Sequence, residues 1–291
     1  MGLRAKFNLA VLAAFLIGFA LAGFLLQRLF VENARDEVVQ NARIMMQAAD
    51  AIRHFTDTQV APLAAAQNSV KFNAASVPSF VAQTTFKDVQ ARFPDYTYRE
   101  PTLNPTNLSD RPADWEADYI NAFRNGKDTK ELVGVRDTPT GPSLSLARPI
   151  AVSDDGCLSC HSTPARAPAA MVATYGSANG FGWHLHEIVG AQVVSVPMSV
   201  PLMKARQLFL AFMGILLAMF VVIVVILNIL LHYMVIRPVV KVSRIANAVS
   251  LGELDVEEFE HKGRDEISVL AASFNRMRRS LDSALHMLER T

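Results

Sequence analysis

The residues whose types and spacing indicate a specific chemistry are two cysteines and a histidine. The chain contains two cysteines, and both lie in the segment Cys157-Leu158-Ser159-Cys160-His161. This is the C-x-x-C-H pattern of c-type haem attachment. Two thiols three positions apart can add to the two vinyl groups of one porphyrin, and the adjacent imidazole is then held beneath the iron as an axial ligand. We therefore expect one covalently attached haem c per chain.

Three other roles of the cysteine pair are less consistent with the sequence. A thioredoxin-like dithiol would lie at the start of a helix in a parallel α/β unit, whereas residues 154–156 and 162–164 on either side indicate a loop. A structural zinc site needs four ligands, and the chain has no second cysteine pair. A disulfide would close too small a loop to stabilise the fold much. Haem attachment is the favoured interpretation, and it takes place outside the cytoplasm.

The second axial ligand of the iron is open. His54 is preferred, because it lies on the helix expected after the first apolar run, where a bond to iron would tie the haem pocket to the membrane. His184 and His186 flank Leu185 at strand spacing, so they would share one face of a strand and could line the pocket instead. A vacant position would permit small-gas binding. The methionine candidates are Met45, Met46, Met171 and Met198.

Two arginines are expected near the propionates of the haem. Arg99 and Arg148 could each form charge-assisted hydrogen bonds to a carboxylate. An ordinary surface or structural ion pair is an equally good interpretation of each arginine.

Other functional classes find no support in the sequence. No pair of carboxylates stands beside a base or a nucleophile, and no glycine-rich phosphate loop occurs, so we expect no enzyme activity. The net charge is +1 and the basic residues form no stripe, which argues against nucleic-acid binding.

Two apolar runs are long enough to cross a membrane. Residues 7–26 include no charged residue, and residues 208–231 include Asn228 as the only strongly polar one. About 20 residues of helix cross the ~30 Å hydrocarbon core. A cleaved signal peptide is the alternative for the first run, but the run is longer than a signal-peptide core and its small-x-small site, Ala20-Leu21-Ala22, lies inside it.

The basic residues that flank the two runs predict the topology. They place both termini in the cytoplasm, and the segment between the runs in the periplasm of a bacterial inner-membrane protein. These residues are Arg4, Lys6, Arg237, Lys241 and Arg244. We expect an N-terminal anchor at 1–30, a haem domain at 31–205, a second span at 206–232 and a cytoplasmic tail at 233–291.

The segment between the spans is expected to be an α+β, PAS-like sensory domain with a small antiparallel sheet. A helix is predicted over residues 31–58, and another over 114–123. Residues 99–110 indicate an ordered loop. Strands are predicted at 131–135, 143–152 and 188–196, so that the last two bracket the haem motif. The core face of the first helix is expected to contain Val38, Ala42, Met45, Ala49 and Ile52.

The tail has the repeat of a coiled coil. Its second predicted helix has apolar residues at three-and-four spacing, and its first helix keeps the same spacing. Two such helices per chain form half of a four-helix bundle, so the pattern predicts a homodimer. The stripe of the first helix consists of Val239, Val242, Ala246 and Val249, and that of the second of Ile267, Leu270, Phe274, Met277, Leu281, Ala284 and Leu288.

The tail resembles a HAMP domain, through Pro238 after the span, the Gly252-Glu253-Leu254 connector and the Asp265-Glu266-Ile267 start of the second helix. The external segment resembles the DUF3365 family of c-type haem domains. The matching features are Tyr98-Arg99, Asn104-Pro105, the cysteine motif, Gly182-Trp183 and a closing strand over 189–197. The resemblance covers residues 31–205 and 233–288, and it implies a haem-based sensor or redox protein. In some relatives the second iron ligand is a cysteine, and this chain has none to spare.

We therefore expect a transmembrane haem sensor of redox state or of a small ligand. A change at the iron would shift the helix over 31–58 and bias the tail between two packings. No kinase, cyclase or methyl-accepting segment follows the tail helices in this sequence, so the signal would pass to a separate partner. The alternative is an electron-transfer cytochrome or an accessory subunit of a respiratory or photosynthetic complex. A chemoreceptor-like domain without haem would require the C-x-x-C-H motif to be accidental.

Overall fold

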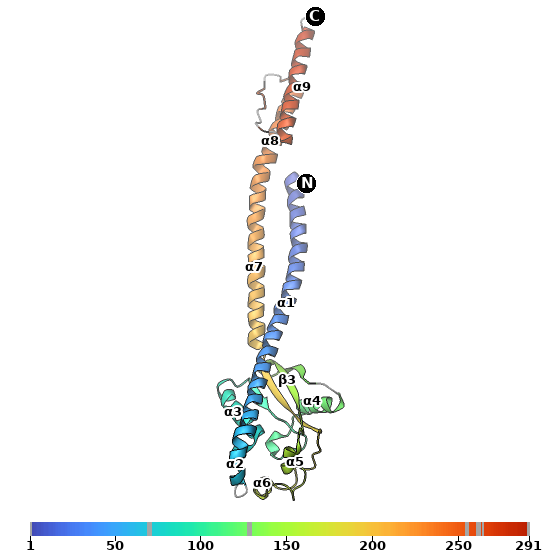
Figure 1. The fold of residues 1–291 in the computed structure, drawn as a ribbon. Helices are drawn as coiled ribbons and strands as arrows, with labels where there is room; N and C mark the ends of the chain where they lie inside the picture. The colour runs from blue at the N-terminus through green and yellow to red at the C-terminus, as the bar shows by residue number, and fades with distance from the viewer. Residues whose placement is uncertain are drawn as a thin grey trace. The chain divides into compact units, whose positions relative to one another are not determined.

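The computed structural model describes residues 2–68, 72–126, 130–253, 256–259, 263 and 265–289. The chain divides into two compact units, Leu26–Phe209 in one, and Met1–Leu25 together with Leu210–Thr291 in the other. Figure 1 labels the main elements.

A four-stranded antiparallel sheet is the centre of the first unit. Its strands are β1 (Thr97–Arg99), β2 (Leu132–Thr138), β3 (Gly141–Ala151) and β4 (Ile188–Pro197), in the order β1-β4-β3-β2. The three strands predicted from alternation are confirmed. Strand β1 was missed because three residues are too few for a period of two to show.

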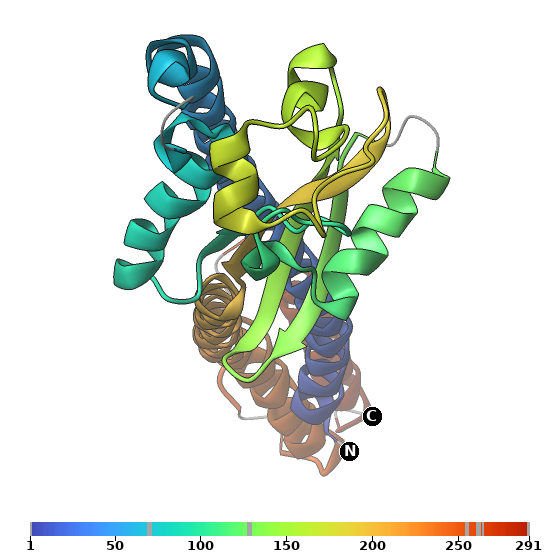
Figure 2. The ribbon, with the colours of Figure 1, turned by 90° about the horizontal axis from the view of Figure 1, so that it is seen from below.

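Helices cover both faces of this sheet, as Figure 2 shows. Leu144, Leu146, Val194 and Val196 pack against α1 (Leu3–Phe55) and α3 (Pro78–Arg92). Ala147, Ala191 and Val193 pack against α4 (Asp114–Asn125) on the other face. Because successive side chains of a strand alternate between faces, each strand contributes to both cores.

The core face of α1 follows the predicted helical period. Its buried residues are Ala34, Val38, Ala42, Met46 and Ala49. Met45 and Ile52 are partly buried beside them. The buried residues follow each other at intervals of four, four, four and three. Met46 is therefore the fully buried methionine, and the expected Met45 is only partly buried.

Two π-turns each precede a proline in a long helix. Residues Thr56–Val60 form a π-turn between α1 and α2 (Ala61–Asn68), and residues Leu231–Ile236 form one between α7 (Ser199–Leu230) and α8 (Arg237–Ser250). The residue before each proline bonds five positions back, from Ala61 N to Thr56 O and from Arg237 N to His232 O. Pro62 and Pro238 lack an N–H and would crowd the carbonyl four residues earlier, so the wider turn accommodates their rings.

Two helical stretches are long and apolar enough to cross a membrane. They are Leu3–Ala64 and Ser199–Ser250, with mean hydropathies of 2.7 and 3.2 in their most apolar windows. In the second unit, the rings of Phe15 and Phe220 stack at 3.7 Å between centroids. Asn8 and Asn228 exchange two amide hydrogen bonds of 3.1 and 2.9 Å. The two apolar helices that the sequence predicts are confirmed.

The tail has a small core of its own. Val242 and Val249 of α8 pack against Ala271 and Phe274 of α9 (Glu266–Glu289), with Phe259 of the connector between them. Asn275 holds the connector, since its amide accepts from Phe259 N at 3.3 Å and donates to Phe259 O at 3.1 Å. The predicted second helix begins where expected, with Asp265 Oδ1 accepting from Ser268 N at 2.8 Å.

The predicted tail seam divides into two parts. Phe274 is buried within the chain, whereas Leu270, Met277 and Leu281 of the same stripe are exposed. Leu254 and the side chain of Leu288 lie outside the described residues. An exposed apolar row on a helix is what a second chain would cover in a coiled coil.

Candidate haem site

The cysteine motif lies on a short helix, α5 (Asp155–His161). Asp154 caps this helix, because its Oδ1 accepts from Gly156 N at 2.8 Å and from Cys157 N at 3.3 Å. The expectation of a loop before the motif was therefore wrong at residues 155 and 156, because the cap at Asp154 starts a helix at Asp155. The motif therefore lies at the start of a helix, as in a thioredoxin-like unit, but the described sheet is antiparallel, whereas that unit is parallel α/β.

Both thiols are free and partly accessible. Three positions apart on a helix, Cys157 and Cys160 project from the same face. The hydrogen bonds of Asp154 lower the pKa of its own carboxyl group, first through Ser153 and then through the backbone of Cys157 and Gly156. The capping carboxylate therefore stays charged and keeps the first turn of α5 formed.

His161 is held in one orientation by three neighbours. Its Nδ1 donates to the carbonyl oxygen of Gly180 at 2.8 Å, and Thr106 Oγ1 lies 3.4 Å from the same atom. The ring of Trp183 stacks on the imidazole, with 4.0 Å between centroids and 11° between planes. This arrangement assigns the proton to Nδ1 and leaves Nε2 as the metal-binding nitrogen.

Burial lowers the pKa of His161, and the hydrogen bond to Gly180 opposes this shift in part. The imidazole is therefore neutral near pH 7, which is the form that ligates iron. A backbone carbonyl on the far ring nitrogen also raises the basicity of a ligating histidine.

The loop that contains Asn104 fixes the position of the Gly180 carbonyl. Asn104 accepts from Gly180 N and donates to the carbonyl of Phe181, each at 3.0 Å. The loop also bonds back to the motif, from Gly182 N to Ser162 O at 2.9 Å. Gly180 has a φ of +83°, and a Cβ there would lie 2.8 Å from Thr106 Cα. Only glycine fits this position.

The residues present fit a haem c. Ser162 Oγ and Trp183 Nε1 are buried and have no hydrogen-bond partner among the described residues. Buried donors without partners are costly, so a bound group with acceptor atoms would satisfy them. Two free thiols on one face and a neutral histidine with an available Nε2 complete the donor set that haem attachment requires.

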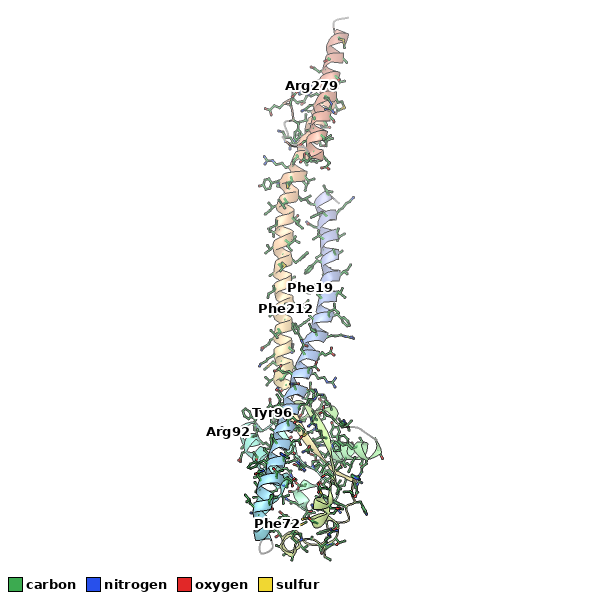
Figure 3. All side chains as sticks on the ribbon, viewed as in Figure 1. Phe19, Phe72, Arg92, Tyr96, Phe212 and Arg279 are labelled. Carbon is green, nitrogen blue, oxygen red and sulfur yellow. The ribbon has the colours of Figure 1, made fainter. Side chains whose placement is uncertain are left out.

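His54 lies in the last turn of α1 and is exposed. Figure 1 shows α2, α5 and α6 (Ala169–Tyr175) at the same end of the domain. Phe72, which follows α2 and is labelled in Figure 3, meets Tyr175 at the end of α6 in an edge contact of 5.6 Å. This contact joins Phe72, and not His54 itself, to α6, so the role of His54 as an iron ligand stays a prediction.

The other proposed ligands have different surroundings. Met46 and Met198 belong to the core between α1 and the sheet, with Met45 partly buried beside them, and Met171 is buried on α6. The expectation that His184 and His186 share a face of a strand was wrong. They lie in an exposed turn before β4, and His186 has a φ of +65°, which no strand residue adopts.

Arg99 is held by a buried carboxylate. Its Nη1 contacts both oxygens of Glu116 at 2.9 and 3.1 Å, and its Nη2 donates to the carbonyls of Ser109 and Arg111. Arg148 binds Asp50 Oδ2 and Glu131 Oε2, each at 3.2 Å.

The two arginines lie on opposite faces of the sheet. Arg99 pairs with Val193, which faces α4, whereas Arg148 pairs with Gln192, which bonds to Asp50 of α1. The structure therefore does not bring the two arginines together, and their contact with propionates stays a prediction. Arg148 lies on the face of the sheet that is covered by α1, the helix that contains His54.

A buried network anchors the end of α1 to β1. Glu100, only 3 % exposed, accepts from Tyr98 Oη at 2.7 Å and pairs with Arg53, the neighbour of His54. Burial, together with the charge of Glu100, raises the pKa of Tyr98 far above its ordinary value. The sequence offered no signal for this network, because Arg53 lies 47 positions before Glu100 and only the fold brings them together.

Comparisons with known proteins identify the family of this chain. A family profile described as Tll0287-like matches residues 31–197, and one described as HAMP domain matches residues 230–283. None of the curated proteins compared with the chain matches it. A solved structure, described as the cyanobacterial heme-protein Tll0287, is 18% identical, with a TM-score of 0.43, and covers 55% of this chain and 95% of its own. The first profile spans more than half of the chain, which therefore belongs to the Tll0287-like family of haem proteins.

Proposed function

We propose that this protein is a haem-based sensor of redox state or of a small ligand, which signals through its HAMP domain to a separate partner. Cys157 and Cys160 would hold a haem c covalently, and His161 and His54 would ligate its iron. The PAS-like haem domain lies in the periplasm of a bacterial inner membrane, and both termini lie in the cytoplasm. The chain functions as a homodimer through the exposed residues of α9.

The observation that carries the proposal is the orientation of His161. A carbonyl on Nδ1 and an indole on its ring face prepare a neutral imidazole for a metal, next to two free thiols. The same chain continues into a HAMP domain, a module of signalling proteins that dimerise. A carrier of electrons has no need of that module.

Helix α1 is the element that connects the site to the membrane. When bound, haem supplies an iron whose charge and ligation change with redox state or with a small ligand. His54 offers an exposed imidazole on a helix that is continuous from Leu3 to Phe55 and includes the first apolar run. If the strength of the bond at His54 differs between two states, the equilibrium position of α1 differs as well.

The ligand assignment is tested by absorption spectra of oxidised and reduced protein, made in a host with periplasmic haem-attachment machinery. We expect low-spin bands in the wild type that are lost in His54→Ala and kept in His184→Ala, the matched exposed histidine. Spectra of His54→Ala that equal those of the wild type would move the second ligand elsewhere.

The sensor role is tested by hydrogen exchange of the full-length protein in lipid nanodiscs. We expect the amides of α8 and α9 to change protection between the oxidised and reduced states, and the change to disappear in His54→Ala. Equal protection in both states, together with fast electron exchange with a soluble redox protein, would favour an electron-transfer cytochrome.

A further inference from the structure

Positive charge is concentrated where the first apolar helix begins and the second one ends. Arg4 and Lys6 precede the first apolar run, and the basic residues of α8 follow the second. No aspartate or glutamate occurs before Glu32 or between Glu187 and Glu253. The five cations of this collar are Arg4, Lys6, Arg237, Lys241 and Arg244, and all are exposed.

Contacts along the helices bring Arg4 beside the segment that leads into the basic residues of α8. Arg4 donates to Nδ1 of His232, and one turn away Asn8 pairs with Asn228. The stacking of Phe15 on Phe220 continues the same antiparallel register. Arg237 lies five residues beyond His232, which is about 7.5 Å along a helix.

The collar is not neutralised by carboxylates in the part of the chain that the structure describes. Among the described residues, none of its five cations forms an ion pair with a carboxylate, although Lys241 Nζ lies 5.5 Å from the centroid of the Phe259 ring. On α8, the cations at 237, 241 and 244 follow a spacing of four and three, so they share one face. The opposite face includes Val242 and Val249, which are buried against α9 and the connector.

The other flanks of the two runs have a different charge balance. Residues 27–40 contain two arginines and three acidic residues, and the segment before the second run adds Lys204 and Arg206. That flank therefore has a net charge of +1, against +5 for the collar. Charge is concentrated at one membrane surface only.

We propose that the collar is a binding site for anionic phospholipid headgroups, and that these lipids hold α8 at the membrane surface. The inference rests on the membrane topology proposed above. A headgroup layer several ångströms thick follows the hydrocarbon, and Tyr233, exposed just before the cations, belongs to the residue types that concentrate there. Juxtamembrane lysines and arginines attract anionic lipids within about a Debye length, ~10 Å.

The ligand chemistry follows from the donors. Exposed guanidinium and ammonium groups without carboxylate partners bind phosphate diesters through charge-assisted hydrogen bonds. Because the buried face of α8 is part of the tail core, lipid contact on its basic face would determine where that core begins relative to the membrane. The content of anionic lipid would then modulate the tail independently of the haem.

The test uses the full-length, haem-loaded protein in phosphatidylcholine nanodiscs with trace spin-labelled lipid. Electron spin resonance measures the motionally restricted fraction of spin-labelled phosphatidylglycerol and of spin-labelled phosphatidylcholine. We expect a preference for phosphatidylglycerol of at least about fivefold, the effect of a single cation at the surface, which weakens in high salt. Arg237→Gln/Arg244→Gln should lose most of it, whereas Arg237→Lys/Arg244→Lys should keep it.

The matched control is Lys204→Gln/Arg206→Gln, which removes two cations from the other flank and should leave the preference unchanged. Equal restriction of both lipids by the wild type would overturn the proposal, and so would equal losses in the two glutamine variants. The haem spectrum of each sample separates this outcome from failure of the proposed topology. Covalent haem attachment takes place outside the cytoplasm, so an inverted chain would lack haem.

Discussion

His161 owes its orientation to residues of two loops that the fold brings to it. The carbonyl of Gly180, the ring of Trp183 and the amide of Asn104 together keep its Nδ1 protonated and its Nε2 available. Loss of such an outer contact typically costs about 10–100-fold in metal affinity or activity. They also identify residues whose substitution should affect the haem without touching it.

Gly180→Ala should prevent the loop from closing over His161. The new Cβ would lie 2.8 Å from Thr106 Cα at a positive φ, so we expect about 1–3 kcal/mol of overpacking in addition to about 1–3 kcal/mol of backbone strain. Gly176→Ala is the matched control, since its φ is +81° and a Cβ there meets nothing within 4 Å. Urea unfolding measures both variants, and equal destabilisation would show that the close approach to Thr106 is unimportant.

Asn104→Ala should change the electronic properties of the site. Loss of its two hydrogen bonds frees Gly180 to move away from Nδ1, which lowers the basicity of the imidazole. We expect the midpoint potential of the haem to rise by at most about 40 mV, the equivalent of about 1 kcal/mol. Asn107→Ala, which removes only the cap on Ser109 N, should leave the potential unchanged. An unchanged potential in Asn104→Ala would contradict this role.

The motif residues could be predicted from the sequence, because covalent attachment requires fixed neighbours in the chain. The residues that contact His161 could not be predicted in this way. Thr106 and Gly180 are brought to His161 only by the fold, and the nearest signals were the Asn104-Pro105 turn and the glycines of the later loop. The expected propionate arginines illustrate the same limit, since sequence alone does not tell that strand positions 99 and 148 face opposite sides of the sheet.

Among the elements, helix α1 was the best predicted, since a long apolar period survives any tertiary context. The continuation of α7 into α8 was harder to foresee, because a proline ordinarily ends a helix, and here a π-turn accommodates it. The short helix α5 was not predicted, because its first turn has the composition of a loop. Seven residues with aspartate and glycine in the first turn resemble a loop until a cap is seen.

The attachment of α1 to β1 should depend on pH. The raised pKa of buried Tyr98 stabilises the fold fully below the ordinary tyrosine pKa of about 10, and this stabilisation is lost as the pH rises beyond it, because the unfolded chain then releases the proton. We expect the free energy of unfolding to fall above pH 10 by up to about 1.4 kcal/mol per pH unit. Tyr98→Phe should show a shallower fall than Tyr96→Phe, and identical slopes in denaturant titrations would exclude the network as the cause.

The two apolar helices should be coupled by their amide pair. Asn8 and Asn228 donate to each other, and hydrogen bonds between spanning helices contribute about 0.6–2 kcal/mol. A double-mutant cycle of Asn8→Leu and Asn228→Leu, measured by unfolding in detergent micelles, should give a coupling energy in that range. Strictly additive effects would mean that the pair is not formed in the folded protein.

At the scale of the molecule, two domains and two apolar helices serve one proposed sequence of events. A haem-protein domain and a HAMP domain lie on either side of an apolar helix, and a second apolar helix leads into the haem domain. The order of these modules could be predicted from composition and motifs alone. The stimulus could not be predicted from the sequence. It depends on the second iron ligand, and the identity of that ligand depends on how the end of α1 meets the site.

The central claim is that this chain carries a covalent haem at Cys157 and Cys160. It is tested most directly by the mass and the reduced absorption spectrum of the denatured chain, made in a host with periplasmic haem-attachment machinery. We expect the wild type to gain the mass of one haem and to keep a haem c spectrum after denaturation, and Cys157→Ala/Cys160→Ala to lose both. A wild-type chain that contains no haem, or that releases it on denaturation, would contradict the account.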